Sequence, residues 1–460
     1  MIEVLVVPTE ELGDRSYVVH DGEVAVVVDP QRDIDRLEAV LDEHGLGCAY
    51  VLETHVHNDY VSGGPVLAER RGARVVLSAA DAVAYDHVAV SDGDRLTAGT
   101  LTVTVVETPG HTDGHLAYVV SDGGPVPAVL TGGSLLYGSV GRTDLVDVTR
   151  TEELARRQFR SAHRLADLLP GEAPVYPTHG FGSFCSAGAA TGGDASTVAL
   201  ERTRNDALVT DDEDAFVAAL VAGLTAYPAY YVHMGPRNRE GAGPVDLSLP
   251  ALVDGDELRQ RIAAGEWVVD LRTRSAHAAG HLRGTIGVPL ELSFATTVGW
   301  IVPLDAPITL LGASSEDVTA AQRQLVRIGI DRPAAAGVGD HRQWTAPDEQ
   351  LASFRRASFA DLTPASLGDG VVVDVRRVDE RRDGALVGSL HVPLHDLPAR
   401  LGDLPRRTLW VHCGAGYRAT VAAGILQRAG FDVVVLDDDW ANAGRSALTV
   451  APPTVASLAR

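Results

Sequence analysis

The sequence predicts an α/β protein of several domains, and three observations support that fold class. With 460 residues the chain is too long for one hydrophobic core, so roughly two to four domains are expected. Its first 200 residues interleave short β-branched runs with amphipathic helical stretches. Beyond about residue 250 the chain repeats its own pattern over roughly 100 residues, which indicates two copies of one smaller α/β unit.

The secondary structure of the N-terminal half follows from its hydrophobic pattern. Short β-branched runs bounded by turn residues predict strands at Val4–Val7, Val24–Asp29, Val51–Thr54, Val75–Ser78 and Leu101–Glu107. Apolar residues at helical spacing predict helices over Asp33–His44, Thr151–Leu169 and about 212–225. The aromatic segment Tyr227–Tyr231 then leads into a stretch rich in Gly and Pro, Pro236–Pro250, which is expected to be a polar linker.

The internal repeat lies beyond that linker and can be aligned at three places. The paired segments are Trp267–Arg272 with Val371–Arg376, Gly280–Leu290 with Gly384–Leu394, and Gln324–Ile330 with Leu426–Phe431. In this alignment Gly312 stands where the second copy has Cys413, and Asp317 stands where it has Arg418. The first copy therefore has no nucleophile, and we interpret it as a structural or interface domain.

Charge and composition exclude several classes of protein. The formal net charge of -23 disfavours binding to nucleic acid. No apolar run approaches the ~20 residues that cross a bilayer, and the acidic N-terminus does not resemble a signal peptide. The chain contains no lysine, which excludes Schiff-base catalysis and P-loop nucleotide binding. Its 3 cysteines, an odd and sparse number, predict a reducing cytoplasm rather than a disulfide framework.

A glycine-rich loop surrounds Cys413 in the run His412-Cys-Gly-Ala-Gly-Tyr-Arg418. Leu409–His412 is expected to be a buried strand and Ala419–Ala429 a helix, so Cys413 opens the loop between them. Inward-facing backbone N–H groups and the positive helix end would stabilise a thiolate and lower its pKa. The candidate site residues are the nucleophile Cys413, the anion-binding Arg418, and the substrate-contacting Gly414, Gly416 and Tyr417. The alternative is an inert buried cysteine that ends a strand.

Residues 355–460 resemble the rhodanese (sulfurtransferase) family. The resemblance rests on the strand end Asp374-Val-Arg376, the segment Gly384–Leu394 and the Cys-x-x-Gly-x-Arg-Ala loop. It implies that Cys413 carries a covalent persulfide between a sulfur donor and an acceptor. A tyrosine-phosphatase-like loop is the alternative, but this loop has one residue fewer between Cys and Arg. A shorter ring suits a single sulfur better than a phosphoryl group.

Histidines and an aspartate gather in three turn-bounded motifs of the N-terminal half. The motifs are Thr54-His-Val-His-Asn-Asp59-Tyr60, Thr108-Pro-Gly-His-Thr-Asp-Gly-His115 and Pro177-Thr-His-Gly180. His55 and His57 alternate after an apolar run, so both leave a strand end on the same side. Loops at one edge of a sheet can bring them to the other histidines, and neutral imidazoles suit zinc, iron or manganese. The candidate metal ligands are His55, His57 and His111, with Asp59 and His179 as weaker or indirect candidates.

Residues 1–240 resemble the metallo-β-lactamase superfamily, and most closely its persulfide dioxygenase and glyoxalase II branch. The matching segments are Thr54–Asp59, Glu107–His115, Leu130–Leu136, Gly141–Leu145 and Tyr176–Gly180. The resemblance implies an αββα sandwich followed by a degenerate and then an active rhodanese-like domain, as in persulfide dioxygenase–sulfurtransferase fusions. The three domains would span residues 1–248, 249–352 and 353–460.

Two positions depart from the pattern of that superfamily. Tyr60 stands where two-metal members have a histidine ligand, which disfavours a dinuclear hydrolase. Gly133 stands where persulfide dioxygenases have the carboxylate of a two-histidine, one-carboxylate iron site. Three outcomes stay open: iron held by imidazoles, zinc that activates water, or no metal at all. Asp144 is interpreted as a structural residue rather than a substitute ligand, and Cys185 as either a core residue or a redox or substrate-relay thiol.

Together the resemblances imply an enzyme that oxidises a low-molecular-weight persulfide to sulfite at mononuclear non-haem iron and transfers sulfane sulfur through Cys413. The expected partners are a thiol persulfide, sulfite or thiosulfate, with no nucleic acid and no membrane, in a cytoplasmic homo-oligomer. Two alternatives remain. One is a glyoxalase II-like zinc thioester hydrolase fused to a sulfurtransferase. The other is a metal-free scaffold that carries only sulfurtransferase activity.

Overall fold

The computed structural model describes residues 2–188, 193–291, 293–346, 350–382 and 384–451. Contacts divide the chain into two compact units: residues 1–246 with the short segment 326–329, and residues 247–325 with 330–460. None of the helices in the described ranges combines the length and apolarity that a bilayer-spanning segment requires. The expected division into three domains remains a prediction.

Two mixed sheets form the first unit, and each has six strands within the described residues. The first sheet runs in the order β1 (Glu3–Thr9), β2 (Asp14–His20), β3 (Val24–Val28), β4 (Gly47–Leu52), β5 (Arg74–Ser78) and β6 (Val88–Val90). The second runs in the order β12 (Ser196–Thr197), β11 (Pro174–Pro177), β10 (Ala128–Gly132), β9 (Leu116–Ser121), β8 (Leu101–Glu107) and β7 (Arg95–Ala98).

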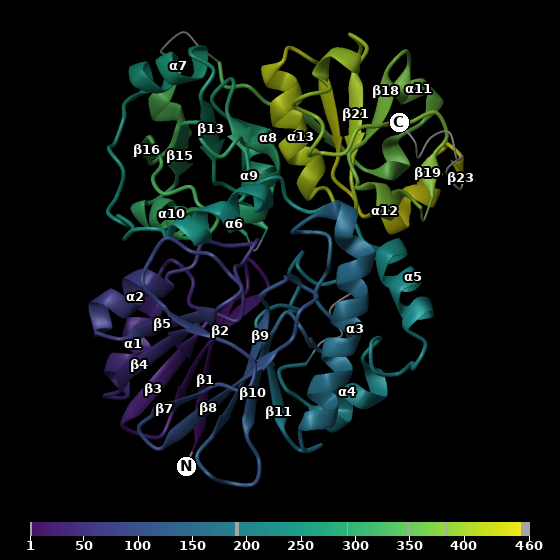
Figure 1. Cartoon of the computed structure of the whole chain (residues 1–460). Coiled ribbons are helices and arrows are strands. Elements are labelled where there is room, and N and C mark those ends of the chain that lie inside the picture. Colours follow the sequence, from purple (N-terminus) through teal and green to yellow (C-terminus); the bar gives the residue numbers. More distant parts are fainter. Residues whose placement is uncertain (1, 189–192, 292, 347–349, 383, 452–460) are drawn as a thin grey trace. The chain divides into compact units, whose positions relative to one another are not determined.

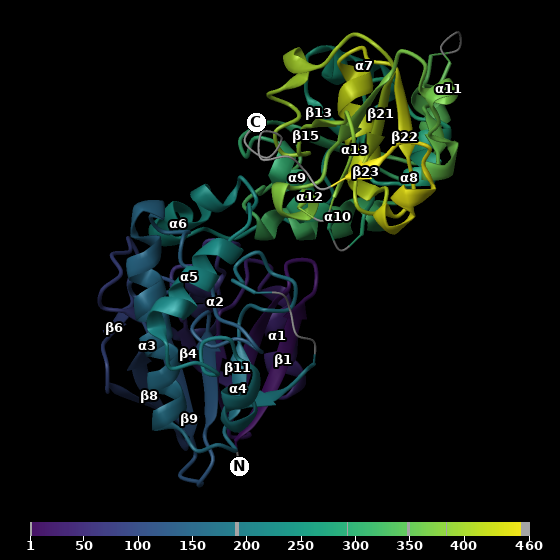
Figure 2. The ribbon, with the colours of Figure 1, turned by 90° about the vertical axis from the view of Figure 1, so that its right-hand side faces the viewer.

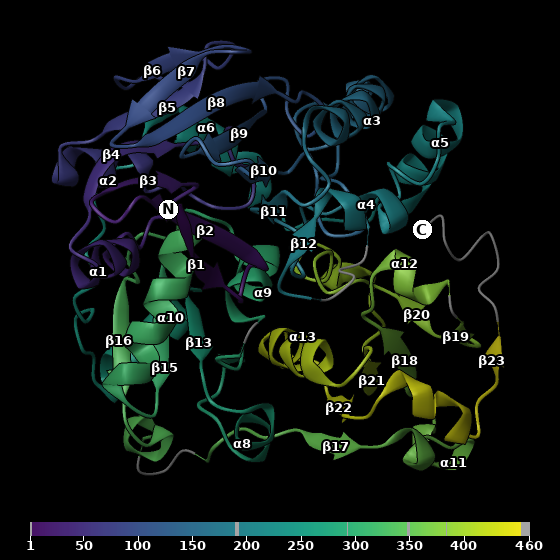
Figure 3. The same cartoon turned by 90° about the horizontal axis from the view of Figure 1, so that it is seen from below.

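The buried core of this unit lies between the two sheets. Tyr17 and Leu52 from the first sheet pack in one cluster with Val103 and Tyr118 from the second. Helices cover the outer faces: α1 (Asp35–Glu43) and α2 (Gly64–Arg71) pack on the first sheet. The second sheet is covered by α3 (Thr151–Leu168) and α5 (Glu213–Gly223), and α4 (Val198–Arg204) follows β12 (Figures 1 and 3). The predicted αββα sandwich is therefore confirmed.

One prediction in this unit is wrong at its start. Helix α6 (Tyr231–Glu240) occupies the first part of the expected linker, with Pro236 inside the helix. Tertiary contacts stabilise it, because Tyr231 and Met234 are buried. The Asn238 side chain also donates to the backbone oxygens of His57 and Tyr60, each at 2.8 Å. These contacts offset the hydrogen bond that proline removes.

Two parallel sheets organise the second unit. The smaller runs in the order β14 (Ile286–Gly287), β13 (Trp267–Asp270), β15 (Ile308–Gly312) and β16 (Ala335–Val338). The larger runs in the order β17 (Arg355–Ala357), β22 (Val433–Leu436), β21 (Leu409–His412), β18 (Val371–Asp374) and β20 (Leu390–His391). A separate antiparallel pair joins β19 (Ala385–Leu386) and β23 (Val450–Ala451).

The helices of the second unit lie between and beside these strands, and Figure 2 shows α13 alongside β21 and β22. The α-helices are α7 (Gly255–Ala263), α8 (Arg274–Ala279), α9 (Phe294–Ile301), α10 (Ser315–Arg327), α11 (Pro364–Leu367), α12 (Val378–Arg381) and α13 (Tyr417–Arg428). Short 3-10 helices cover Val148–Arg150, His341–Trp344, Phe359–Asp361, Leu401–Asp403 and Trp440–Arg445.

The predicted repeat is present in the two sheets of this unit, and equivalent residues even form equivalent hydrogen bonds. At the end of β13, Arg272 pairs with Asp270 at 2.5 Å and donates to the Gly280 oxygen at 3.0 Å. The second copy has the same arrangement, in which Arg376 pairs with Asp374 at 2.7 Å and donates to the Gly384 oxygen at 2.7 Å. Strand register sets Asp270 beside Leu311 and Asp374 beside His412. Gly312 is therefore the structural counterpart of Cys413.

Candidate metal centre and cysteine loop

Four imidazoles meet where loops follow β4, β8 and β11 in the first unit. His55 and His57 follow β4, His111 follows β8, and His179 follows β11. All four side chains are buried, at 0–1% exposure. The ring centroid of His55 lies 4.0 Å from that of His57 and 4.8 Å from that of His111. The centroid of His179 lies 5.3 Å from that of His55, so the motifs predicted to converge do so.

The donor atoms of these residues form overlapping groups in which every pair lies within 4.8 Å. One group is His55, His111 and His179; another is His57, Asp59 and His179. The structure thus divides the expected ligands His55, His57 and His111 between two groups. His179, a weaker candidate in the sequence, belongs to both.

Hydrogen bonds determine which nitrogen of His55 can bind a metal. The Thr54 hydroxyl uses its single hydrogen to donate a hydrogen bond to Asp29 at 2.8 Å, so it accepts a hydrogen bond from His55 Nδ1 at 2.9 Å. The lone pair of His55 therefore lies on Nε2. Burial, followed by the neighbouring imidazoles, holds the pKa of His55 well below its usual value, so the ring is neutral.

His111 also donates a hydrogen bond through Nδ1 and has its lone pair on Nε2, whereas both nitrogens of its neighbour His115 are occupied. Nδ1 of His111 donates to the Arg142 backbone oxygen at 2.7 Å, and its buried Nε2 has no partner. Burial lowers the pKa of His111 to about 3, so the ring is neutral and this lone pair is free. In His115 both nitrogens are engaged, because Nε2 accepts from Gly133 N at 2.8 Å and Nδ1 lies 2.8 Å from the Thr108 hydroxyl. His115 is a structural residue.

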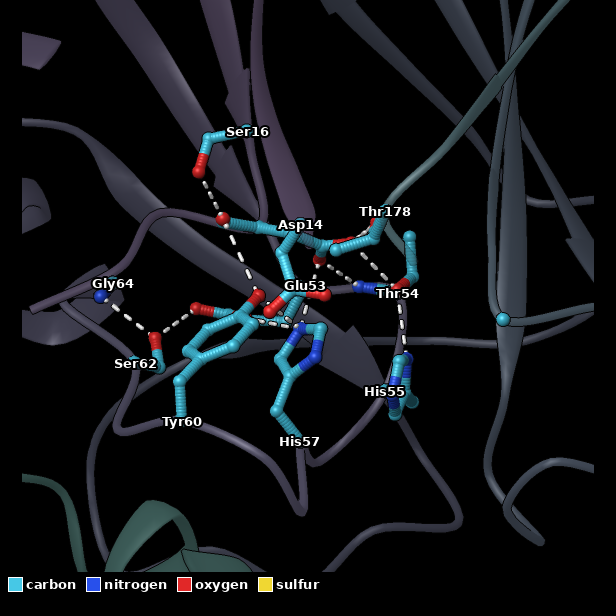
Figure 4. Close-up of polar contacts among 12 residues, drawn as sticks. Asp14, Ser16, Glu53, Thr54, His55, His57, Tyr60, Ser62, Gly64 and Thr178 are labelled. Atoms are coloured by element: carbon cyan, nitrogen blue, oxygen red, sulfur yellow. Dashed lines mark hydrogen bonds and ion pairs between the residues drawn. The ribbon is translucent and has the colours of Figure 1, made fainter. Parts of the chain in front are cut away.

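His57 faces a buried acidic group (Figure 4). Its Nε2 lies 3.2 Å from Asp29, 3.4 Å from Glu53 and 3.0 Å from the Tyr60 hydroxyl, while Nδ1 has no partner. Burial alone would lower the pKa of His57, but Asp29 and Glu53 raise it to about 9. The Tyr60 hydroxyl thus contacts the same nitrogen of His57 as the two carboxylates do.

His179 is held by two carboxylates on one side of its ring. Nδ1 lies 2.9 Å from Asp14 and 3.1 Å from Asp59, and Nε2 lies 3.4 Å from Nε2 of His55. Although burial opposes it, Asp59 and Asp14 raise the pKa of His179 well above its usual value. Nδ1 of His179 is thus directed at the carboxylates and Nε2 at His55.

Sequence reasoning missed three acidic residues of this centre: Asp14, Asp29 and Glu53. Asp29 directly follows the buried strand β3 and has a positive φ of 51°, which is uncommon for a residue other than glycine. Its carboxylate accepts from Thr54 N at 2.7 Å and from the Thr178 hydroxyl. The position of Asp29, a charged residue directly after a fully apolar strand, could have identified it from the sequence. No such pattern marks Asp14, which lies at the start of β2.

Glycines enclose the His111 ring. A Cβ atom built on Gly133 would lie 2.4 Å from His111 Cδ2, and one built on Gly141 would lie 2.6 Å from His111 Nδ1. The imidazole therefore fills the space that a side chain at position 133 would need. Asp144 forms a pair with Arg142 at 2.7 Å, in line with its expected structural role. Cys185 is buried, and burial followed by Asp59 and Asp14 raises its pKa well above the usual value.

The cysteine loop lies in the second unit, between β21 and α13. Cys413 follows β21 directly and is 1% exposed. Gly416 adopts a left-handed conformation with φ 85° and caps α13, which begins at Tyr417, two residues before the predicted start. A Cβ atom on Gly416 would collide with Asp437, so the loop requires glycine there. The strand, loop and helix therefore follow the predicted order.

The charged group beside the thiol is already paired. Arg418 forms two hydrogen bonds with Glu380, at 2.5 and 2.6 Å, and both side chains are about one-quarter exposed. Residues of the first repeat also contact the loop: Arg274 donates to the Ala415 oxygen at 2.7 Å, and the Tyr417 hydroxyl donates to the Pro289 oxygen at 3.4 Å. Anion binding by Arg418 and substrate contact by Gly414, Gly416 and Tyr417 remain predictions.

Comparisons with known proteins assign the histidine cluster and the cysteine loop to two different families. The family model "Metallo-beta-lactamase superfamily" matches residues 12–179, and "Rhodanese-like domain" matches residues 360–443. The mitochondrial persulfide dioxygenase of Homo sapiens is 30% identical over 205 residues, which are 44% of this chain and 72% of that protein. A hydroxyacylglutathione hydrolase of Cereibacter sphaeroides is 39% identical over 184 residues, which are 39% of this chain and 66% of that protein.

A solved structure extends the similarity beyond the first unit. The metallo-β-lactamase from Staphylococcus aureus subsp. aureus COL matches with a TM-score of 0.66 and 27% identity, over 74% of this chain and 99% of that one. Family models, relatives and fold therefore point the same way. The chain is an enzyme of the metallo-β-lactamase superfamily, in which a domain related to persulfide dioxygenases is joined to a C-terminal rhodanese domain.

Proposed function

We propose that the chain is a persulfide dioxygenase and sulfurtransferase. One observation carries this proposal: a buried cluster of imidazoles, in which Nε2 of His111 has no partner, and a buried thiol in the loop between β21 and α13 occur in the same chain. A metal centre and a sulfur-carrying cysteine are the two parts that persulfide oxidation with sulfur transfer requires. The similarity to a persulfide dioxygenase supports the same assignment.

The imidazole cluster fits a mononuclear metal ion, and iron is the ion that we propose. His55 and His111 would hold it through Nε2, since their Nδ1 atoms already donate to Thr54 and to a backbone oxygen. His57 and His179 offer further nitrogen donors, and Asp59 an oxygen. When bound, iron would supply the redox chemistry that activates dioxygen; zinc would supply only Lewis acidity. Burial of all these residues excludes bulk water from the reacting groups.

The proposed oxidation and transfer are two balanced reactions. A thiol persulfide, dioxygen and water would give the thiol, sulfite and two protons. In the transfer, the Cys413 thiolate would attack the outer sulfur of thiosulfate. The sulfur–sulfur bond of thiosulfate would break, sulfite would leave with the bonding electrons, and Cys413 would carry a persulfide. An acceptor thiol, sulfite or cyanide would then remove that sulfur. The substrates would accordingly be small sulfur compounds.

A second candidate is a thioester hydrolase, which the similarity to a hydroxyacylglutathione hydrolase supports. That activity would need a metal that activates water, and it would not consume oxygen. Tyr60 disfavours a second metal ion, because its hydroxyl is already bonded to His57 and to the Asp29 backbone oxygen. The single-metal dioxygenase is therefore the preferred proposal.

Metal analysis combined with an oxygen electrode tests the proposal. We expect about one iron per chain and oxygen uptake when glutathione persulfide is added. Iron-free protein that takes up no oxygen after anaerobic loading with Fe(II) would contradict the dioxygenase proposal. Hydrolysis of S-lactoylglutathione under nitrogen would favour the hydrolase instead.

A further inference from the structure

His179 links the donor group that holds His55 and His111 to the donor group that holds His57 and Asp59. It enters from the loop after β11, and the printed sequence places it more than sixty residues beyond His111. Its side chain is completely buried, so its contacts are all with protein. These contacts decide which of its two nitrogens can serve a metal ion.

The two nitrogens of His179 lie in different surroundings. Nδ1 is directed at two carboxylates, Asp14 at 2.9 Å and Asp59 at 3.1 Å. Nε2 points the other way, to His55 Nε2 at 3.4 Å, and the His179 ring shares one donor group with His55 and His111. A metal ion can bind one nitrogen of the ring without displacing a carboxylate only at Nε2. This geometry favours the group His55, His111 and His179 over the group that contains Asp59.

The neighbouring position 133 cannot contribute a ligand in this arrangement. Gly133 has no side chain, and a Cβ atom there would lie 2.4 Å from Cδ2 of His111. Three neutral imidazoles would leave the whole double charge on a divalent metal ion. Carboxylates behind a ligating histidine compensate such a charge and orient the ring. Asp14 and Asp59 stand in that relation to His179.

We propose that His179 completes an all-imidazole metal site with His55 and His111, and that Asp14 and Asp59 supply through its ring the negative charge that no direct ligand supplies. This inference rests on the proposed function only in assuming that the first unit binds a metal ion. It assigns a direct role to a residue that the sequence treats as a weak candidate, and an indirect one to Asp14.

The test measures metal binding rather than turnover. Full-length chain is loaded anaerobically with Fe(II) alone, and iron per chain and its dissociation constant are determined for each variant. We expect His179→Gln to weaken Fe(II) binding roughly 100-fold or more, and Asp14→Asn about 10- to 100-fold. His233→Gln, which removes an exposed imidazole of α6, should bind like the unmodified chain. Thermal unfolding of each variant shows whether it has folded. If His179→Gln does not fold, the Fe(II) affinity of Asp14→Asn tests the inference instead.

Matched substitution of His57 separates the possible ligand sets. If His57→Gln abolishes Fe(II) binding while His179→Gln binds normally, the inference is wrong and the set is His55, His57 and His111. X-ray absorption of the Fe(II) form should show imidazole scattering without a carboxylate ligand; a bound carboxylate overturns the inference, as does a chain that binds no Fe(II). If Fe(II) binds as proposed but no oxygen is consumed, the inference stands and the dioxygenase proposal fails.

Discussion

The histidine cluster and the cysteine loop are both buried at the ends of strands, yet they are built in opposite ways. The loop is continuous: Cys413, its glycines and Arg418 lie within six residues of the chain. The cluster is assembled from distant segments, since the groups that orient its rings come from β2, from the residue after β3 and from the loop after β10. A continuous site depends on backbone geometry, whereas an assembled site depends on how two sheets pack.

Removal of the nucleophile should have the largest effect and would show that the two sites are separable. Cys413→Ser should reduce thiosulfate-to-cyanide sulfur transfer about a thousandfold or more, because the attacking thiolate is lost. Cys48→Ser is the matched control. Burial raises the pKa of Cys48 to about 11, so this thiol is a poor nucleophile and its loss should leave transfer unchanged. Oxygen uptake should be the same in both variants, and retained transfer in Cys413→Ser would refute the rhodanese assignment.

Loss of one imidazole should abolish oxygen uptake and leave sulfur transfer unchanged. His111→Ala removes a free Nε2 from the cluster, so we expect metal affinity to fall roughly 100-fold or more and oxygen uptake to disappear. Sulfur transfer through Cys413 should continue at its normal rate. A measurement of iron content beside both activities checks this. If sulfur transfer falls in parallel with oxygen uptake, the two sites are coupled and the comparison drawn above does not hold.

A smaller effect on stability should distinguish the packed cluster from an open surface. Gly133→Ala places a methyl group against His111, so the free energy of unfolding should fall by about 1–3 kcal/mol. Gly402→Ala is the control, because a Cβ atom there meets nothing within 4 Å. Urea denaturation of the metal-free chain measures both. An unchanged unfolding energy in Gly133→Ala would mean that the ring moves aside without cost, and that a ligand could return to position 133.

The smallest expected effect concerns the charge beside the thiol. Glu380→Gln should release Arg418 and lower the KM for thiosulfate by up to about 5-fold, because a partly exposed pair contributes about 1 kcal/mol or less. Asp379→Asn changes the same charge one residue away, but Asp379 pairs with Arg377, so KM should change less. Steady-state kinetics at two salt concentrations would show whether the gain is electrostatic. If KM for thiosulfate falls equally in both variants, the change results from net charge alone and not from the release of Arg418.

Local patterns were sufficient for much of the fold. The β-branched runs predicted β3, β5 and β8 closely, and the repeat predicted which positions of the two parallel sheets correspond. The prediction that the linker starts at Pro236 was wrong, because the burial of Tyr231 and Met234 and the bonds of Asn238 maintain a helix there. These stabilising contacts involve residues far away in the chain, which no local pattern describes.

The sequence by itself determined the α/β class, the internal repeat, the cysteine loop and the histidines that converge, since each depends on spacing along the chain; the αββα sandwich was what the resemblance to a known family implied. Only the tertiary structure decided which nitrogen of each ring is free, that His115 is saturated and that His179 lies between His55 and two carboxylates. The physical reason is that a lone pair is directed by the partner of the other nitrogen, and those partners are carried by strands remote in sequence.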